Sequence, residues 1–229
     1  MPVIQIARQE LTMNIRNRWT VIFAIVFGAL VACLAYVVMM AVGFSGMQSF
    51  TRTSASILNL VLYIVPLVSL TMGTLSFTGD KGSTELLFSQ PVKPSEIVVG
   101  KILGLFGSIA LSMISGFVVA GGIIAAQSTS EGLASYVLFV ILSLSLSLVF
   151  LSLALLVSTL ARRKAKAFGV SLFLWFFFVL FYDLLAIGVT LLLKGSSANL
   201  FLFLSLFGNP VDLVRVASLI IFDNVTIFG

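Results

Sequence analysis

Residues 20–42 read TVIFAIVFGALVACLAYVVMMAV, a stretch without a single charged side chain. A helix that crosses about 30 Å of hydrocarbon needs roughly 20 mostly apolar residues, and this stretch supplies them. The whole chain has the same character, because 60% of its 229 residues are hydrophobic and only 9% are charged. Soluble domains carry about a quarter of their residues charged. One water-soluble core could not bury this much apolar surface, so lipid is the solvent for most of the chain.

Four further stretches are long and apolar enough to span a bilayer, namely 57–77, 102–126, 134–160 and 167–193. Together with 20–42 they predict an all-α integral membrane protein, a polytopic helical bundle of five spans that forms one domain over 1–229. The first span is longer than the core of a signal peptide and lacks a small-residue cleavage site, so we interpret it as an uncleaved helix. The single cysteine, Cys33, excludes an intrachain disulfide.

The basic residues predict which side of the membrane each connection faces, because cytoplasmic loops are enriched in Lys and Arg. The N-terminal segment and the second and fourth connections hold Arg8, Arg16, Arg18, Lys81, Lys93, Lys101, Arg162, Arg163, Lys164 and Lys166. Only Arg52, Lys194 and Arg215 fall on the other side. This distribution predicts a cytoplasmic N-terminus and makes 78–100 a cytoplasmic loop. It also favours a topology signal over a nucleic-acid partner.

Residues 3–18 predict an amphipathic helix that lies in the headgroup plane. Its predicted apolar stripe consists of Ile4, Ala7, Leu11 and Ile15, and its predicted polar stripe of Arg8, Thr12 and Arg16. Trp19 would anchor the corner where the chain enters the bilayer. The alternative is a basic N-terminal tail without helical structure.

The region 194–229 is apolar but is interrupted at Gly208-Asn209-Pro210. Asn209 suits an N-cap, Pro210 the first helical position, and Asp212 the end of a helix dipole that favours negative charge. Five spans and a cytoplasmic N-terminus place this region outside. We therefore expect two short re-entrant helices in the outer leaflet, and the alternative is a sixth span broken at the proline.

Small residues recur every four positions along the third predicted span. They are Gly100, Gly104, Ser108, Ser112, Gly116 and Ala120. Such a stripe lets another helix approach closely, which is how helices associate in lipid. The pattern predicts helix packing, within the bundle or across a dimer, and does not predict chemistry.

Asp183 is the only acidic residue inside a predicted span. An intramembrane acid is a functional candidate by default, because lipid solvates it poorly. Asp183 could line a pathway, pair with Tyr182 or with a basic group on a neighbouring helix, or simply hold helices together beside a water-filled cavity. The side chain alone does not choose among these roles.

The chain offers no catalytic, metal or cofactor site that its sequence would predict. It contains no histidine, which removes Ser–His and Cys–His nucleophile pairs and His-based zinc sites. Met39, Met40 and Met47 could suggest Cu(I) because thioethers suit that ion. Without Cys or His beside them, methionines in lipid are usually ordinary apolar packing.

The loop 78–100 concentrates charges of both signs in a chain that has few. Asp80 can cap a short helix over 83–88, and Pro91 can end it. A helix this short is not stable alone in water, so we expect it to dock onto a partner. Its docking surface would consist of the apolar Leu86, Leu87 and Phe88 and the charged Glu85.

The segment STELLFSQPV at 83–92, followed by GKILG at 100–104, resembles the coupling helix of ABC type-2 permeases, the membrane halves of ABC exporters. The resemblance covers nearly the whole chain. It assigns contact with the ATPase to Asp80, Ser83, Thr84, Glu85, Leu86, Leu87, Phe88 and Pro91. Where the family often has an acidic pair before this helix, the chain has Gly79-Asp80-Lys81-Gly82, which leaves one carboxylate.

The resemblance also implies the assembly. It implies a cytoplasmic ABC ATPase that binds ATP and magnesium, a second permease copy that makes a homodimer, and a location in the cell membrane. The family has six spans, so we expect this sequence to lack the last one. Within the family, RNRW at 16–19, RTSASILNLVL at 52–62 and NPVDLVR at 209–215 are similar to NosY-type permeases, which serve in assembling the copper centres of nitrous-oxide reductase.

The residues and the resemblance together predict a permease subunit that moves or presents a substrate with ATP hydrolysed elsewhere. The chain has no GxxxxGK[ST] phosphate loop, so it cannot supply the ATPase itself. An ATP-independent carrier or channel is the alternative, but it would predict internal repeats, and none is found. A membrane-embedded enzyme would need clustered acids or histidines. No pattern marks a pocket for a particular substrate.

Overall fold

The computed structural model describes residues 2–42, 46–78, 93–125, 133–161, 163–193 and 196–228. Over these ranges the chain is almost entirely helical and has no strand, which confirms the predicted all-α class. The helices are α1 (Pro2–Ile15), α2 (Arg18–Val42), α3 (Gly46–Phe77), α5 (Pro94–Ala125), α6 (Leu133–Leu160), α7 (Lys164–Phe176), the π-helix η2 (Phe177–Phe181), α8 (Tyr182–Leu192), α9 (Ser196–Gly208) and α10 (Pro210–Phe228).

Five segments of the described chain are long and apolar enough to cross a membrane, as predicted. They are Arg18–Val38, Thr53–Phe77, Pro94–Ile123, Ala134–Leu160 and Lys164–Leu192. The third begins at Pro94, well before the predicted start at 102, because the first turn is capped. The backbone N–H of Lys93 donates to Glu96 Oε2 at 3.3 Å, as in a capping box, and Pro94 occupies the first helical position.

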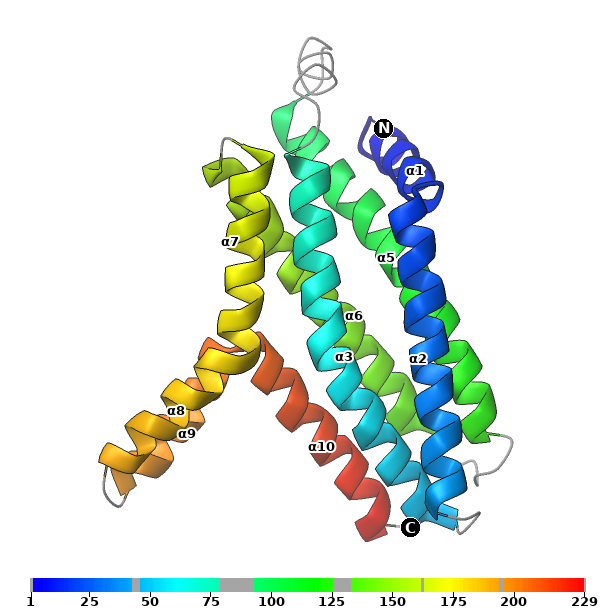
Figure 1. Cartoon of the computed structure of the whole chain (residues 1–229), viewed down its shortest axis with the longest axis vertical. Coiled ribbons are helices and arrows are strands. Elements are labelled where there is room, and N and C mark those ends of the chain that lie inside the picture. Colours follow the sequence, from blue (N-terminus) through cyan, green and yellow to red (C-terminus); the bar gives the residue numbers. More distant parts are fainter. Residues whose placement is uncertain are drawn as a thin grey trace.

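Figure 1 shows α2, α3, α5 and α6 side by side, with α1 at their upper end. The centre of the bundle is a row of phenylalanine rings. The ring centroids of Phe27 and Phe117 are 5.5 Å apart, those of Phe117 and Phe139 are 5.7 Å apart, and those of Phe139 and Phe222 are 5.6 Å apart. These rings come from α2, α5, α6 and α10, so aromatic packing joins the beginning of the chain to its end.

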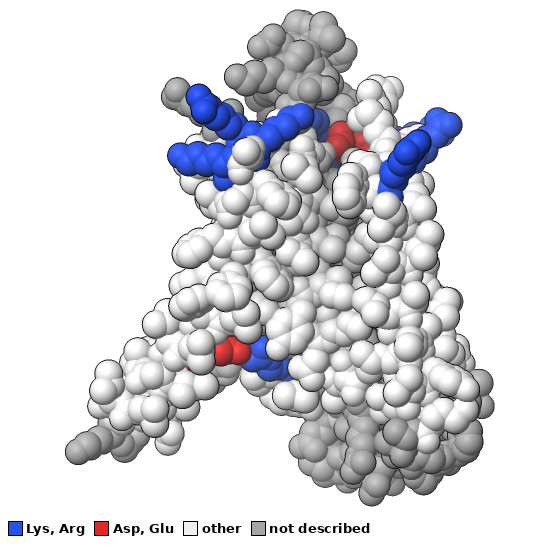
Figure 2. Space-filling view, viewed as in Figure 1, with Lys and Arg blue, Asp and Glu red and all other residues white. Residues whose placement is uncertain are grey.

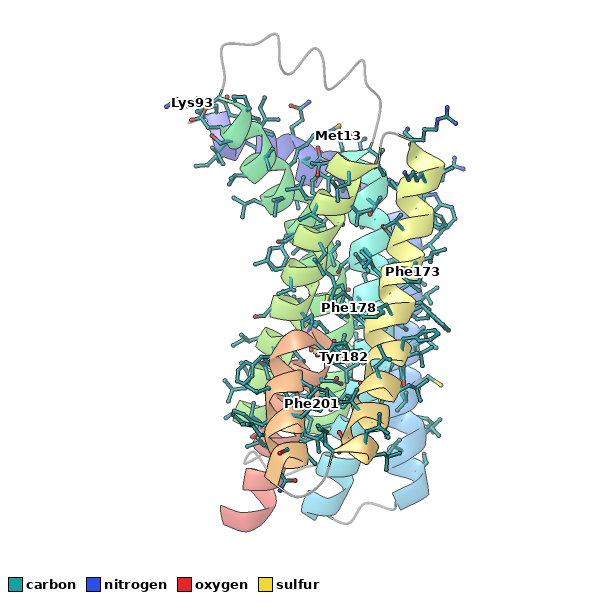
Figure 3. The ribbon with its side chains drawn as sticks, turned by 90° about the vertical axis from the view of Figure 1, so that its left-hand side faces the viewer. Met13, Lys93, Phe173, Phe178, Tyr182 and Phe201 are labelled. Carbon is teal, nitrogen blue, oxygen red and sulfur yellow. The ribbon has the colours of Figure 1, made fainter. Side chains whose placement is uncertain are left out.

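The fifth span stands beside the bundle and changes direction at η2 (Figure 1). Its upper half, α7, packs on α3, and its lower half, α8, packs on α9. Figure 3 shows Phe173, Phe178 and Tyr182 following one another down this segment, with Phe201 of α9 near Tyr182. The change of direction therefore separates a part that belongs to the bundle from a part that belongs to the last two helices.

The pair α9 and α10 is bent by 107° at Asn209. In Figure 1, α9 returns along α8 toward the centre of the molecule and α10 then runs to the lower end, where it packs on α6 and α3. The break falls at the predicted Gly208-Asn209-Pro210 interruption. A bend of this kind fits both the re-entrant pair and the broken sixth span, so both stay predictions.

The predicted interfacial helix is present, but its predicted apolar stripe is wrong. The helix ends at Ile15, before the predicted end at 18, and α2 begins at Arg18. Ile4 and Ile15 are 63% and 42% exposed, whereas Glu10 is buried. The face that contacts the bundle is centred on Ala7 and Glu10, because the neighbouring helix presents glycines there.

Candidate functional site

α1 packs on the start of α5 at two glycines of the small-residue stripe. A β-carbon at position 104 would lie 2.5 Å from the backbone oxygen of Ala7 and 2.6 Å from Glu10 Cβ. A β-carbon at position 100 would lie 2.8 Å from Ile6 Cγ2. Real β-carbons do not approach other atoms this closely, so only glycine permits the observed contact between the two helices.

The rest of the stripe faces the interior of the same chain. A β-carbon on Gly116 would lie 2.9 Å from the Phe27 ring and 3.2 Å from the Cα of Gly28, both on α2. Ser108 and Ser112 are buried and donate to carbonyl oxygens of their own helix, and Ala120 is fully buried. The structure therefore places all six stripe positions inside the bundle, the first two against α1 and Gly116 against α2.

Glu10 is a buried carboxylate at this contact, with 6% of its surface exposed. The hydroxyl of Ser76 donates to Glu10 Oε1 at 2.8 Å, and Asn14 Nδ2 donates to the same oxygen at 3.0 Å. Ser76 lies in the last turn of α3, just before the connection 79–92, and α5 begins just after it. α1 is therefore bound to both helices that flank the predicted coupling loop.

The predicted ATPase-contact residues lie outside the described residues, so their roles stay predictions. They are Asp80, Ser83, Thr84, Glu85, Leu86, Leu87, Phe88 and Pro91. The structure describes the two ends of the connection. On one side the Thr78 hydroxyl donates to the backbone oxygen of Thr74, and on the other Glu96 caps the first turn of α5. Both ends are thus anchored helix termini.

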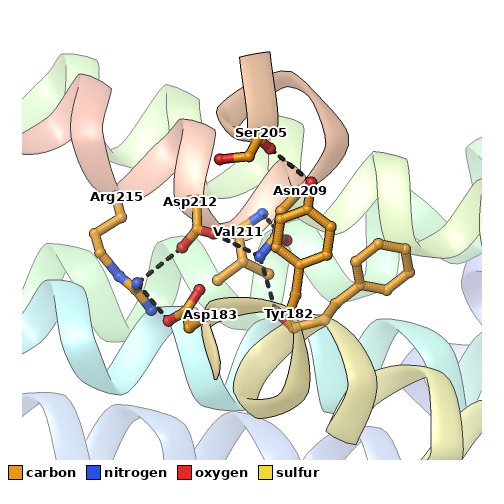
Figure 4. Close-up of polar contacts among 8 residues, drawn as sticks. Tyr182, Asp183, Ser205, Asn209, Val211, Asp212 and Arg215 are labelled. Carbon is orange, nitrogen blue, oxygen red and sulfur yellow. Dashed lines mark hydrogen bonds and ion pairs between the residues drawn. The ribbon is translucent and has the colours of Figure 1, made fainter. Parts of the chain in front are cut away.

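A second candidate site lies where α8 meets α10, and it contains Asp183. Arg215 Nη1 donates to Asp183 Oδ2 at 2.8 Å and to Asp212 Oδ1 at 2.8 Å (Figure 4). These side chains are only partly exposed, at 27% for Arg215, 31% for Asp183 and 12% for Asp212. Among the alternatives for Asp183, the structure shows pairing with a basic group on a neighbouring helix. One guanidinium thus serves two carboxylates.

Asn209 connects this ion pair to the π-helix. Its Nδ2 donates to the backbone oxygen of Phe178 in η2 at 2.9 Å and to Asp212 Oδ2 at 2.8 Å, and its Oδ1 accepts from the backbone N–H of Val211 at 3.0 Å. The last contact is the N-cap predicted from the sequence. The first gives a partner to a carbonyl oxygen in a segment whose regular helical bonding is interrupted. Asn209 thereby holds three helices in one arrangement.

Tyr182 adds a further link between α8 and α9. Its hydroxyl donates to the backbone oxygen of Ser205 at 2.7 Å and lies against Gly208, where a side chain would collide with it. Figure 4 shows Tyr182 on the same side of the bend as Asn209. Neither Glu10 nor the pairing of Arg215 was foreseen from the sequence. The motif NPVDLVR carried the only signal, because its Asp and Arg are one helical turn apart.

We expect Asn209→Ala to lower the free energy of unfolding by about 2 kcal/mol, because it removes an N-cap and a hydrogen bond to a buried carbonyl. The measurement is unfolding by dodecyl sulfate in mixed micelles, followed by circular dichroism. Asn59→Ala is the matched control, since the Asn59 side chain is exposed and bonds only within its own helix. Equal losses in the two variants would contradict the bridging role of Asn209.

Across the described residues no group of three or more His, Cys, Asp or Glu side chains lies close enough to hold a metal ion. The two sites defined by the structure are instead a close helix contact beside a loop and an ion-paired helix junction. Both occur in a polytopic helical membrane protein whose basic side chains gather at one end (Figure 2). This is the general class that the fold defines.

Comparison with known proteins identifies the family. Residues 4–222 match the family described as ABC-2 family transporter protein. The chain is 35% identical to the "Probable ABC transporter permease protein NosY" of Pseudomonas aeruginosa, over 97% of this chain and 84% of that protein. It is 32% identical to the protein of the same name from Stutzerimonas stutzeri, over 97% of this chain and 83% of that protein. The chain belongs to the ABC-2 family of transporter proteins.

Family membership confirms the resemblance seen at 83–92 and 100–104, and the two relatives confirm the similarity to NosY permeases. The protein is the membrane subunit of an ABC transporter, a multi-pass permease of the cell membrane. Its class is therefore that of a transporter permease.

Proposed function

We propose that this permease is driven by a separate cytoplasmic ABC ATPase, which docks on the connection 79–92 and moves the bundle through α1. The observation that carries this proposal is the attachment of α1 to both flanks of the connection. Ser76 of α3 donates to Glu10, and Gly100 and Gly104 of α5 lie directly against α1. A displacement of the loop must therefore displace α1, α3 and α5 together.

The packing beyond α1 supports a route for this motion. Tightly packed helices transmit displacement because they have little room to deform. The stripe on α5 continues from the α1 contact to Gly116, which meets Phe27 and Gly28 of α2. When ATP closes the partner ATPases, the loop is pushed, α5 moves with α1, and α2 follows at Gly116. The chain itself contributes no phosphate loop to this step.

The assembly in this proposal contains two permease copies and two ATPase subunits. A single bundle of this size is half of a transporter, which supports a homodimer. Both relatives are named as NosY permeases, and this supports a role in maturation of a copper enzyme, which resemblance to NosY-type permeases implies. The substrate would then be moved or presented across the membrane for that maturation.

The paired substitution of Glu85→Ala and Leu87→Ala tests the docking site. The double variant should insert in the membrane at the normal level but retain at least about tenfold less ATPase in a gentle-detergent pull-down, because a buried anchor and a charge are both lost. Nucleotide-binding proteins are identified by mass spectrometry. Glu131→Ala, on the connection predicted to be external, is the matched acid-to-alanine control. Full retention by the double variant would overturn the docking role of 79–92.

A further inference from the structure

A groove of about 930 Å³ opens at the basic end of the bundle, between the corner that joins α1 to α2, the helix α3, and α7. α2 and α7 each pack on α3 and scarcely touch each other in the described part of the chain. The groove is the space this arrangement leaves. Met13, which Figure 3 shows at the upper end of the molecule, lies on one of its walls.

The groove has the length of a lipid chain in one leaflet. On α7 its lining residues are Lys164, Phe168 and Leu172, which follow one another at intervals of four residues. At 1.5 Å per residue this wall extends about 12 Å. Half of a hydrocarbon core about 30 Å thick is about 15 Å. Leu67, Met72 and Leu75 line the opposite wall on α3, so the inner part of the groove is mainly apolar.

The mouth of the groove is polar and positively charged. Lys164 and Asn17 line it, and the exposed Arg16 and Arg18 adjoin Asn17 in the chain. Figure 2 shows Lys and Arg side chains gathered at this end of the molecule. The only acid in the lining is Glu10, and its Oε1 already accepts from both Ser76 and Asn14. Charge complementarity at the mouth therefore favours an anion.

Trp19 marks the depth of the mouth. Its side chain lines the groove and is 70% exposed. Tryptophan side chains concentrate at the level of lipid headgroups. Basic pockets between helices at this level are suited to anionic headgroups. The groove thus combines a cationic mouth at headgroup depth with an apolar channel that runs toward the middle of the membrane.

We infer that the groove binds an anionic phospholipid from the leaflet at the basic end of the bundle. Its phosphate lies at Lys164 and Asn17, and one acyl chain lies between α3 and α7. The lipid fills the space between α2 and α7 and joins the α1–α2 corner to α7. This site is independent of the ATPase docking proposed above.

Fluorescence of Trp19 tests the inference. The sequence has two tryptophans, so Trp175→Phe leaves Trp19 as the sole emitter. The full chain, purified with its bound partners, is reconstituted in phosphatidylcholine vesicles that contain a minor, fixed fraction of brominated phosphatidylglycerol or brominated phosphatidylcholine. We expect quenching by the brominated phosphatidylglycerol to report about fivefold enrichment of that lipid at Trp19, the preference that one basic side chain gives.

Two variants separate a built site from general attraction to the surface. Lys164→Gln should abolish the preference, and Lys166→Gln should keep it, because Lys166 is exposed on the same helix but does not line the groove. Thr71→Phe should reduce quenching by both brominated lipids, because Thr71 lines the groove and its hydroxyl bonds only within its own helix. The preference measured in Lys164→Gln does not depend on whether Thr71→Phe folds.

Three results would overturn the inference. Equal quenching by the two lipids would show ordinary surrounding lipid. Quenching by neither would show that protein, such as a second copy of this chain, covers the groove. Equal loss of preference in Lys164→Gln and Lys166→Gln would show surface charge alone.

Discussion

Gly104→Ala should loosen α1 from α5 and lower the free energy of unfolding by about 1–3 kcal/mol, the usual cost of an extra carbon in a packed contact. The new β-carbon would meet the backbone oxygen of Ala7 at 2.5 Å and Glu10 Cβ at 2.6 Å. Both belong to the backbone or its first side-chain atom and cannot rotate away. α1 must therefore shift as a whole, which also pulls Glu10 from Ser76.

The neighbouring glycines turn this expectation into a graded series. At Gly100 the nearest atoms belong to the Ile6 side chain, which can move, so Gly100→Ala should cost less. At Gly122, on the same helix, no atom lies within 4 Å, so Gly122→Ala should be neutral or slightly stabilising. Unfolding by dodecyl sulfate in mixed micelles gives the stabilities. In the assembled transporter, Gly104→Ala should also lower ATP-driven transport more than ATP hydrolysis.

The order of the three variants decides the matter. If Gly104→Ala and Gly122→Ala have the same stability, α1 does not pack on α5 as the structure shows. If Gly104→Ala is destabilised but transport and ATP hydrolysis stay in proportion, α1 is only a structural support and not part of the coupling.

Arg215→Gln should lower the free energy of unfolding by about 3 kcal/mol, because it leaves two carboxylates, Asp183 and Asp212, without their cation. A charge left at membrane depth costs about 2.5–3.5 kcal/mol on insertion scales. The partial exposure of all three side chains keeps the expected loss at the lower end of the 3–5 kcal/mol range for broken buried pairs.

A second substitution in the same chain tests the charge explanation. Arg215→Gln combined with Asp183→Asn should recover part of the lost stability, because only Asp212 then stays charged. Asp183→Asn alone should cost less than Arg215→Gln alone, since Arg215 keeps Asp212 as a partner. Arg8→Gln, on an exposed position of α1, is the charge-matched control and should change little. Absence of any rescue in the double variant would show that Arg215 acts through packing and not through its charge.

The spans were predictable because each depends on residues that are neighbours in the chain. A run such as 20–42 is apolar throughout, and backbone hydrogen bonds within one helix satisfy every N–H and C=O that lipid cannot. The helix ends at Pro94 and Pro210 were readable for the same reason. Lys93, Glu96 and Asn209 cap their helices through contacts within three residues.

The functional contacts were less predictable because they join distant residues. Ser76 and Glu10 are separated by 66 positions, and Arg215 and Asp183 by 32. The predicted stripe on α1 was wrong for this reason. Amphipathic periodicity places apolar side chains against the bilayer, but it does not know that α5 offers glycines and α3 a serine to the opposite face. The π-helix at 177–181 likewise has no local signal in a run of phenylalanines.

Composition and short motifs were enough to establish a membrane bundle, its breaks, and its family, since hydrophobic length, capping and a loop motif are all local properties. The pairing of helices was not readable from them. A lipid environment gives helices little preference for one another through hydrophobicity, so partner choice depends on close packing at Gly104 and on a few polar contacts such as Glu10 with Ser76 and Arg215 with Asp183. Those contacts exist only once the chain has folded.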